Sequence, residues 1–315
     1  VSESDHWMFL SSNTGLTAGR VSPDTALFTY ETVDRIHDSH LHTGCKTVIR
    51  QLKGDHYRYW EPFNNEQNGK YSISRNLYKN SLGNKVCFEE INHDLSLLYR
   101  YVWATSEEYG FIRSCELLNI GSSNASVEVL DGFQNLLPAG TPRHTQTNSS
   151  NLVDAYKWSE LEHVTGLGMY SLFSGITDRA EPCESLKANT VFSLGIKEKI
   201  TLMSSGQINT FKNGGQLTNE SIIKGLRGAY LVSFDLSLAT NESSSWQFIT
   251  NIEQSQSEVV ALLDKLVNEN TISLSIAGSI AKGTDNLARK MAAADGFQTT
   301  YEETVSAHHY ANVLF

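Results

Sequence analysis

The chain has 315 residues, of which 40% are hydrophobic and 10% aromatic, and its formal net charge is -10 with an isoelectric point near 5.5. This composition excludes disorder for most of the length. The acidic charge argues against nucleic acid or an anionic membrane as a partner, because both bind basic surfaces. A neutral ligand fits better, and the length predicts one oversized β domain with an appendage.

The first part of the chain consists of short apolar runs separated by turns. The candidate strands are residues 7–10, 26–30, 46–51, 57–60, 71–73 and 86–88. The tight break at Gly54-Asp55 predicts a hairpin between the third and fourth of them. This spacing of runs is typical of a many-stranded sandwich.

The stretch 94–138 organises the rest of the chain. Apolar and aromatic side chains alternate along its first strand, at Leu95, Leu97, Tyr99, Tyr101 and Trp103. Such a pattern predicts the middle of a large antiparallel sheet, with both of its faces covered. The strand is expected to form a long hairpin with 109–119, and a strand around 127–129 is expected to join them as the third member of a meander.

The second part of the chain turns from strands to helices. Residues 138–151 predict an exposed loop, a short helix is expected after 151, and strands are expected at 168–174, 190–194 and 200–204. Alternation in 230–238 and 246–252 predicts a last hairpin. Apolar residues then recur at helical spacing from 257 to 267. A second helix is predicted from an N-cap at Thr284 to a stop at Gly296.

The end of the chain reads as the opening of another helix. Residues 301–315 finish on an apolar triplet without a cap or a polar exit. We therefore expect the protein to continue beyond Phe315.

The four cysteines, Cys45, Cys87, Cys115 and Cys183, form no C-x-x-C pair, so they indicate neither a zinc site nor a redox motif. Free core thiols are favoured over disulfides, because three of the four fall in predicted strands. No apolar run approaches the ~20 residues of a membrane span, and the first residues lack the features of a signal peptide. A soluble protein is expected, with the cytoplasm and the periplasm both open as its compartment.

Histidines are concentrated in one segment, but their spacing does not predict a metal site. On a strand or a loop the side chains at 37, 40 and 42, with the neighbouring aspartates, would point in different directions. The segment is interpreted as a solvated loop. Its residues are His37, His40, His42, Asp34 and Asp38.

Paired carboxylates, which glycosidic chemistry requires, are also interpreted as structural. Glu89-Glu90 and Glu107-Glu108 are neighbours on strands, so each pair faces opposite sides and is expected on a solvated edge. The segment 178–184 places an arginine between two acids and predicts an ion-paired loop. There is no G-x-S-x-G, P-loop or G-x-G-x-x-G followed by a helix, so the sequence supports neither nucleophilic serine hydrolysis nor nucleotide binding, and no cofactor is predicted.

Several longer blocks resemble the N-terminal region of cellobiose phosphorylase-like proteins, a divergent branch of the inverting glycoside phosphorylases. The resemblance spans nearly the whole chain. It is carried by residues 7–20, 24–36, 60–63, 74–92, 109–119, 130–140, 178–182, 186–195, 295–298 and 308–315.

This resemblance implies a mainly β fold: a large antiparallel β-supersandwich of the galactose mutarotase-like type over residues 1–254, then linker helices over 255–315. The helices would lead to an (α/α)6 barrel outside this chain. The barrel would carry the general acid and the phosphate pocket, because in such enzymes inorganic phosphate attacks the anomeric carbon and no protein base is needed. The resemblance also allows a homodimer.

On this interpretation the chain is a non-catalytic carbohydrate-binding or structural domain of a phosphorylase or hydrolase. Its partner would be an oligosaccharide or polysaccharide, a glucan by preference. The candidate substrate contacts combine arginine, amide and aromatic side chains, which suit sugar hydroxyls and ring faces. They are Arg20, Trp60, Glu61, Arg75 and Asn76.

Two other functions stay open at this point. A stand-alone sugar-binding module would bind glycan without any turnover. A mutarotase-like epimerase would need a histidine and a glutamate that converge in a cleft of the sandwich.

Overall fold

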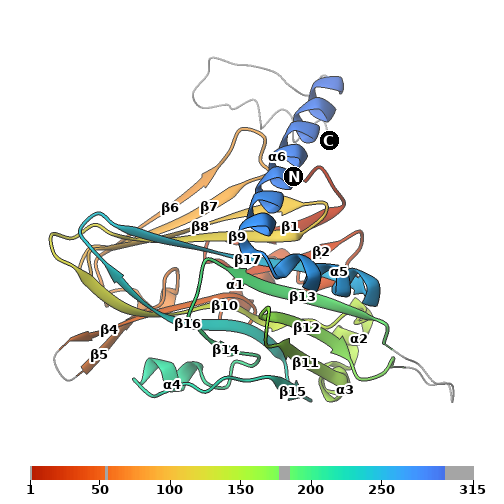
Figure 1. Cartoon of the computed structure of the whole chain (residues 1–315), viewed down its shortest axis with the longest axis horizontal. Coiled ribbons are helices and arrows are strands. Elements are labelled where there is room, and N and C mark those ends of the chain that lie inside the picture. Colours follow the sequence, from red (N-terminus) through yellow and green to blue (C-terminus); the bar gives the residue numbers. More distant parts are fainter. Residues whose placement is uncertain (1, 54–55, 177–184, 295–315) are drawn as a thin grey trace.

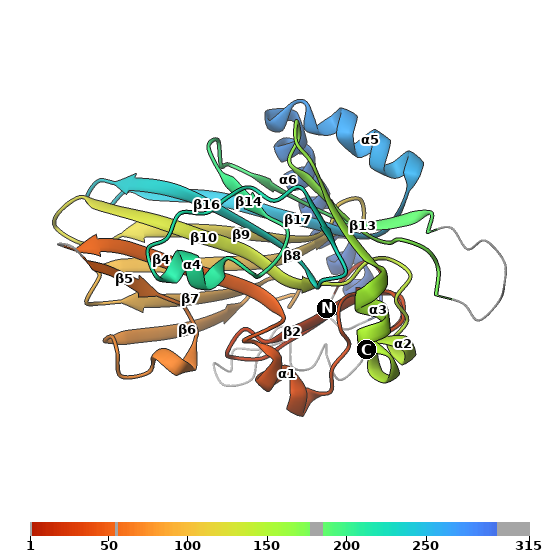
Figure 2. The same cartoon turned by 90° about the horizontal axis from the view of Figure 1, so that it is seen from below.

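The structure, a computed structural model, describes residues 2–53, 56–176 and 185–294. The strands of this part of the chain form three sheets with antiparallel pairing throughout. The nine-stranded sheet curves over the five-stranded sheet, and the small third sheet lies at one end of the pair (Figures 1 and 2).

The strands of each sheet follow in their order from one edge to the other. The nine-stranded sheet contains, from edge to edge, β15 (Ile222–Lys224), β11 (Lys157–Glu162), β12 (Leu167–Leu172), β13 (Lys187–Leu194), β17 (Ser243–Ser255), β9 (Gly110–Asn119), β8 (Leu97–Ser106), β7 (Val86–Asn92) and β6 (Ile73–Lys79). The five-stranded sheet contains β14 (Ile200–Leu202), β16 (Gly228–Leu238), β10 (Ala125–Leu136), β4 (Gly44–Lys53) and β5 (His56–Trp60). The three-stranded sheet contains β1 (His6–Leu10), β2 (Leu16–Arg20) and β3 (Ala26–Phe28).

The main core fills the space between the two large sheets. Tyr99, Tyr101 and Trp103 of β8 point into it, as their alternation predicted. Phe133 of β10 meets the ring of Trp103 from the other sheet, with centroids 5.7 Å apart. The opposite face of β8 is only partly covered, since Arg100 is exposed. The predicted cover on both faces is therefore incomplete.

Two strand pairings differ from the prediction, and both differences have the same cause. β10 does not extend the β8–β9 hairpin but pairs with β4 and β16 in the other sheet. β16 and β17 are not a hairpin either, because β17 pairs with β9 and β13. Both short connections, 120–124 and 239–242, cross from one sheet to the other instead of turning back.

Asn119 ties these two crossing connections together. Its side-chain amide donates to the carbonyl oxygens of Ser123 at 2.8 Å and of Leu238 and Ala239, both at 3.1 Å. Its backbone N–H donates to the Glu242 carbonyl at 3.0 Å. Asn119 is 1% exposed. One buried amide therefore satisfies backbone acceptors that both sheet changes leave free.

Helices occupy the connections and the end of the described chain. The shorter ones are α1 (Val33–Ser39), a 3-10 turn (Asn65–Gln67), α2 (Arg143–Asn148), α3 (Ser150–Tyr156) and α4 (Ile208–Lys212). The region 138–151, predicted as a loop, thus contains α2, although no α2 residue is buried. The short helix expected after residue 151 is α3.

The last two helices, α5 (Gln256–Leu266) and α6 (Glu269–Ala293), cover the outer face of the nine-stranded sheet (Figure 1). Ser255 caps α5 in a capping box with Glu258, and Leu262 packs on the sheet as its spacing predicted. The predicted start of the second helix is wrong. Asn268 is the N-cap of α6, and Thr284 lies inside that helix with its hydroxyl donating to the Ile280 carbonyl.

The predicted fold class, mainly β with large antiparallel sheets followed by helices, is confirmed. The division at residue 254 into two domains stays a prediction, as does continuation into a barrel. Cys45, Cys87 and Cys115 are free thiols. No helix within the described ranges is long and apolar enough to cross a membrane. Cys183, the acidic segment 178–184, Gly296 and the predicted helix 301–315 lie outside the described residues.

Candidate functional site

Two of the five predicted substrate contacts meet through a buried carboxylate. Trp60 is fully buried and its indole N–H donates to Glu90 Oε1 at 2.6 Å. Arg75 Nε donates to Glu90 Oε2 at 2.6 Å, and so does the backbone N–H of Phe63. Glu90 is itself fully buried, so its predicted place on a solvated edge is wrong. The Trp60 ring belongs to the core and has no face open to a ligand.

Glu61 is also buried, and it anchors α4 to the five-stranded sheet. Its carboxylate accepts from Lys46 Nζ at 2.6 Å and forms a second ion pair with Lys212 of α4. Burial alone would raise the pKa of Glu61, but the charges and hydrogen bonds of the two lysines outweigh it and hold the pKa below its ordinary value. The group is therefore an ionised structural clamp.

The other two predicted residues lie in separate networks. Arg20 Nε donates to Asp5 at 2.6 Å, and its guanidinium also pairs with Glu107. The Asn76 amide donates to Glu89 Oε1 at 3.0 Å. The structure thus brings Trp60 and Arg75 together and leaves the remaining three residues in different sets of partners. Contact of Arg20, Arg75 or Asn76 with a substrate stays a prediction.

The described residues contain one group of possible metal ligands, and Arg20 blocks it. Ligand atoms of Asp5, His6 and Glu107 lie within 4.8 Å of one another. Both carboxylates are already paired with the guanidinium. His6 is 7% exposed, and burial and the Arg20 charge lower its pKa to about 4. A buried neutral imidazole beside a paired Glu107 does not favour the epimerase alternative.

A large cleft lies at the free part of β16, beyond the residues that pair with its edge partner β14. β14 pairs only with 231–233 of β16, which leaves the next residues of that strand open at the sheet edge. We call this hollow the β16 cleft; its volume is about 870 Å³. It is lined by Arg50, Glu128, Gly195, Ile196, Lys197, Glu198, Lys199, Ile200, Gln216, Leu217, Ser233, Phe234, Asp235, Leu236 and Ser244.

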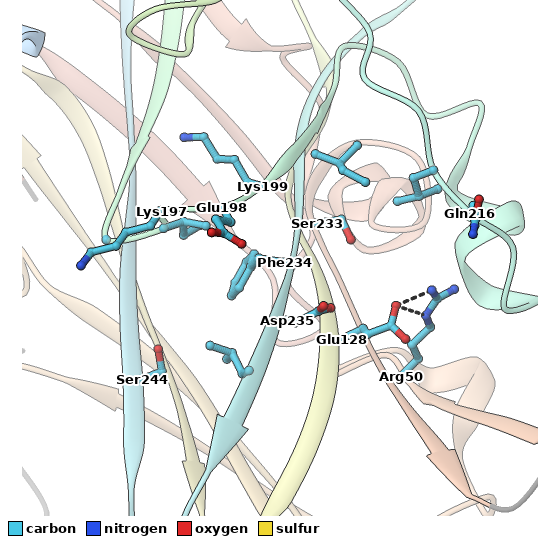
Figure 3. A pocket seen from close by; sticks show the side chains of 15 residues that line it. Arg50, Glu128, Lys197, Glu198, Lys199, Gln216, Ser233, Phe234, Asp235 and Ser244 are labelled. Atoms are coloured by element: carbon cyan, nitrogen blue, oxygen red, sulfur yellow. Dashed lines mark hydrogen bonds and ion pairs between the residues drawn. The ribbon is translucent and has the colours of Figure 1, made fainter.

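Two carboxylates stand side by side in this cleft (Figure 3). Glu128 of β10 and Asp235 of β16 are directly opposite each other in the strand register. Arg50 Nε donates to Glu128 Oε2 at 2.9 Å, and Nη2 of the same guanidinium adds a second bond. Asp235 is exposed, and within the described part of the chain its carboxylate has no ion pair or hydrogen bond. Asp235 is therefore free to accept from a ligand.

Arg50 is rigidly held, so Glu128 is held too. The guanidinium carbon lies 4.6 Å from the ring centroid of Tyr57 and 4.2 Å from that of Phe211. Arg50 Nη1 donates to the Phe211 carbonyl at 2.6 Å. A charged pair that is braced by two rings keeps its geometry when a ligand arrives, which lowers the entropic cost of binding.

Lys199 forms the opposite wall of the cleft. Its ammonium donates to the Ser193 hydroxyl at 2.6 Å, and burial lowers its pKa. Lys197 and Glu198 beside it are exposed. Charged, hydroxyl and apolar groups thus line the same β16 cleft. Such a surface can hydrogen-bond to the hydroxyls of a polar ligand and contact its C–H groups.

The sequence did not point to Glu128, Asp235 or Arg50. Both acids occupy polar positions in predicted strands, which agrees with the exposed Asp235 and the partly exposed Glu128 of the structure. Their adjacency could not be predicted, because it depends on the β10–β16 pairing that the predicted meander excluded.

Searches with the sequence found no matching family model and no matching curated protein. Among solved structures, a bacterial glucoamylase in complex with acarbose matches 100% of this chain and 39% of its own, with 10% identity and a TM-score of 0.54. A protein assigned as a kojibiose phosphorylase, from human microbiome, matches 94% of this chain and 31% of its own, with 7% identity and a TM-score of 0.39. A galactose mutarotase-like protein from Clostridium acetobutylicum matches 79% of this chain and 99% of its own, with 9% identity and a TM-score of 0.32.

The glucoamylase match shows a shared fold over the whole chain. This chain spans about 39% of the length of that enzyme. The predicted likeness to cellobiose phosphorylase-like proteins finds no sequence match. Its coarser part, a sandwich fold that occurs within a carbohydrate-active enzyme, holds.

Proposed function

We propose that the chain is the β-sandwich domain of a carbohydrate-active enzyme of glycoside phosphorylase or hydrolase type, and that it binds oligosaccharide without catalysing a reaction. The fold match with glucoamylase, complete for this chain but limited to 39% of the enzyme, is the observation that carries the proposal. A C-terminal helical barrel would supply the general acid and, in a phosphorylase, the site for inorganic phosphate. Homodimers of the parent enzyme are compatible with this role.

The β16 cleft is the place we propose for the sugar. Its volume of about 870 Å³ suits a ligand of a few rings. Asp235 and the Arg50–Glu128 pair offer charged acceptors and donors for hydroxyl groups, and charge-assisted hydrogen bonds are the stronger ones. The apolar Ile196 and Leu217 provide contact for the less polar sides of a sugar.

The test is calorimetric titration of the chain with maltoheptaose and cellopentaose. Asp235→Asn keeps the shape of the side chain but removes the free carboxylate. Because a hydrogen bond to a charged group contributes roughly 1.5–3 kcal/mol, binding should weaken by about tenfold or more. Asp264→Asn, an exposed carboxylate on α5, is the matched control and should bind as the unchanged chain does.

Two results would contradict the proposal. Equal affinities for Asp235→Asn and the unchanged chain would show that the sugar does not bind in the β16 cleft. Release of glucose or glucose 1-phosphate from these oligosaccharides by the isolated chain would show that it is catalytic. Binding without turnover by the isolated chain supports the proposal.

A further inference from the structure

Two aromatic rings stack on the outer face of the nine-stranded sheet, near the edge formed by β15. Trp158 lies on β11 and Phe173 directly follows β12. Their ring centroids are 5.9 Å apart and their planes differ by 6°. Phe173 is 70% exposed and Trp158 is partly exposed. We call this pair the aromatic platform. Neither residue lines the β16 cleft.

The backbone and a lysine hold the platform in place. Trp158 is directly opposite Lys224 of β15 and Ser171 of β12. The Lys224 ammonium lies 3.7 Å from the centroid of the Trp158 ring. The Phe173 N–H donates to the Tyr156 carbonyl at 2.7 Å, which fixes the residue beyond the end of its strand. Lys224 and Phe173 therefore flank the indole from neighbouring strands, and the stack is formed before any ligand binds.

The exposed rings are bordered by hydrogen-bonding groups rather than by a wide apolar surface. Ser171 lies two residues before Phe173 on the same face, and Glu160 lies two residues after Trp158. Glu160 and Lys224 are exposed. Within the described chain, Lys224 has no ion pair with a carboxylate. A flat ring with acceptors and donors at its rim suits a ligand that has one apolar face and a polar edge.

A sugar ring has this combination, because its axial C–H groups form an apolar face and its hydroxyls form the rim. We infer that the aromatic platform is a second oligosaccharide-binding surface, on which a neutral sugar ring stacks against Phe173 and hydrogen-bonds to Ser171 and Glu160. The inference rests on the proposed function for its substrate class. It adds a separate surface on another sheet, so the chain would bind glucan at two independent places.

The experiment measures each place separately with one probe. Calorimetry with maltoheptaose is carried out on the unchanged chain, on Phe173→Ala and on Asp235→Asn. Phe173→Ala should weaken one of two binding events by roughly fivefold to tenfold, the size of a lost aromatic contact. Because Phe173 is 70% exposed, its replacement should leave the melting temperature unchanged. Phe9→Ala, which removes a 51% exposed ring elsewhere, is the matched control.

Tryptophan fluorescence gives a second readout. Trp60, Trp103 and Trp246 are at most 3% exposed, which leaves the partly exposed Trp7 and Trp158. Trp7 lies on β1 of the three-stranded sheet, so a change of emission on binding maltoheptaose at the platform should come from Trp158. Trp158→Phe keeps a ring in the stack but should abolish the change in emission. Calorimetric affinity should then stay within about twofold of that of the unchanged chain, since a ring still supports Phe173.

The outcomes separate the two proposals. If Phe173→Ala weakens binding and Asp235→Asn does not, the platform stands and the β16 cleft fails. If only Asp235→Asn weakens binding, the platform is refuted and the cleft stands. Absence of any binding at millimolar maltoheptaose would refute both. If the unchanged chain self-associates and Phe173→Ala makes it monomeric without any change in sugar binding, the platform is a contact between copies and our inference is wrong.

Discussion

The buried ion pair at the centre of the sandwich offers the sharpest test of how the two large sheets are joined. Arg113 of β9 and Asp131 of β10 are both fully buried and form an ion pair across the core. The Asp131 carboxylate also accepts from the Thr47 hydroxyl at 2.7 Å and from the Trp246 indole at 2.7 Å. Asp131→Asn removes the charge and keeps the volume.

The expected loss follows from these contacts. An asparagine amide at this position can accept with only one of its two terminal atoms. If its oxygen serves Arg113 and Thr47, its N–H₂ group faces the Trp246 N–H and leaves that donor unpaired. Breaking one partner of a buried pair costs about 3–5 kcal/mol, and an unsatisfied buried donor adds about 1–3 kcal/mol. We expect a loss of at least about 4 kcal/mol, out of a total stability of order 5–15 kcal/mol.

Urea unfolding, followed by tryptophan fluorescence, measures this loss as a shift of the midpoint at constant slope. Lys187→Gln is the control, because it breaks an exposed pair with Glu253 and should cost less than about 1 kcal/mol. The double variant Arg113→Met, Asp131→Leu removes both charges but leaves the Thr47 hydroxyl and the Trp246 N–H without their acceptor, so it should recover only the part of the loss that comes from the unpaired Arg113 charge. A loss below 1 kcal/mol for Asp131→Asn would refute the reasoning.

Three further predictions concern other parts of the chain. The unfolded imidazole of His6 has a pKa near 6.5 and the folded one a pKa of about 4. As the pH falls from about 6.5 to about 4, the unfolded state therefore binds a proton that the folded state does not, and the free energy of unfolding should drop by up to about 3 kcal/mol. Urea unfolding measured at several pH values should show this drop, and the drop should be smaller in His6→Gln. Ser255→Ala removes the cap that accepts from the Glu258 N–H, so amides of α5 should exchange faster, with a cost of about 1 kcal/mol, while strand amides keep their rates. At Gly132, where φ is +151°, an added methyl group would overlap the Tyr230 carbonyl oxygen. Gly132→Ala should therefore lower the urea midpoint by an amount equivalent to about 3 kcal/mol. An unchanged midpoint would contradict this close approach.

The local elements of this fold were readable from the sequence where one face of an element is buried. Tyr99, Tyr101 and Trp103 alternate because every second residue of β8 enters the core. Apolar residues such as Leu262 recur at helical spacing in α5 because one side of this helix packs on the sheet. The start of α6 was misread for a related reason. Thr284 is a good N-cap residue, but inside a helix its hydroxyl can bond to the carbonyl four residues earlier, as it does here.

Which strands pair was not readable, because periodicity reports the buried face of a strand and not its neighbour. β10 and β16 carry the alternation of a hairpin strand, yet each is joined to the preceding or following strand by a connection that changes sheet. Whether a connection turns back within one sheet or crosses to the other is decided here by a hydrogen-bond network between distant residues and not by a local sequence motif. Asn119 donates to three carbonyls on two connections that are about 120 residues apart in sequence.

The candidate sites follow from the same distinction. Trp60, Glu61 and Arg75 have residue types that suit a sugar, but their partners are Glu90 and two lysines of the same chain, so two of the three are consumed by the core. Residue type alone cannot tell a buried clamp from a binding group. Asp235 differs from them because the strand next to it ends early. Asp235 lies on the part of β16 that β14 leaves unpaired, and the β16 cleft and its free carboxylate are found at the same place. In this sandwich the position of the β16 cleft therefore depends on where β14 stops pairing with β16, which is set by strand length and sheet order and by no single residue.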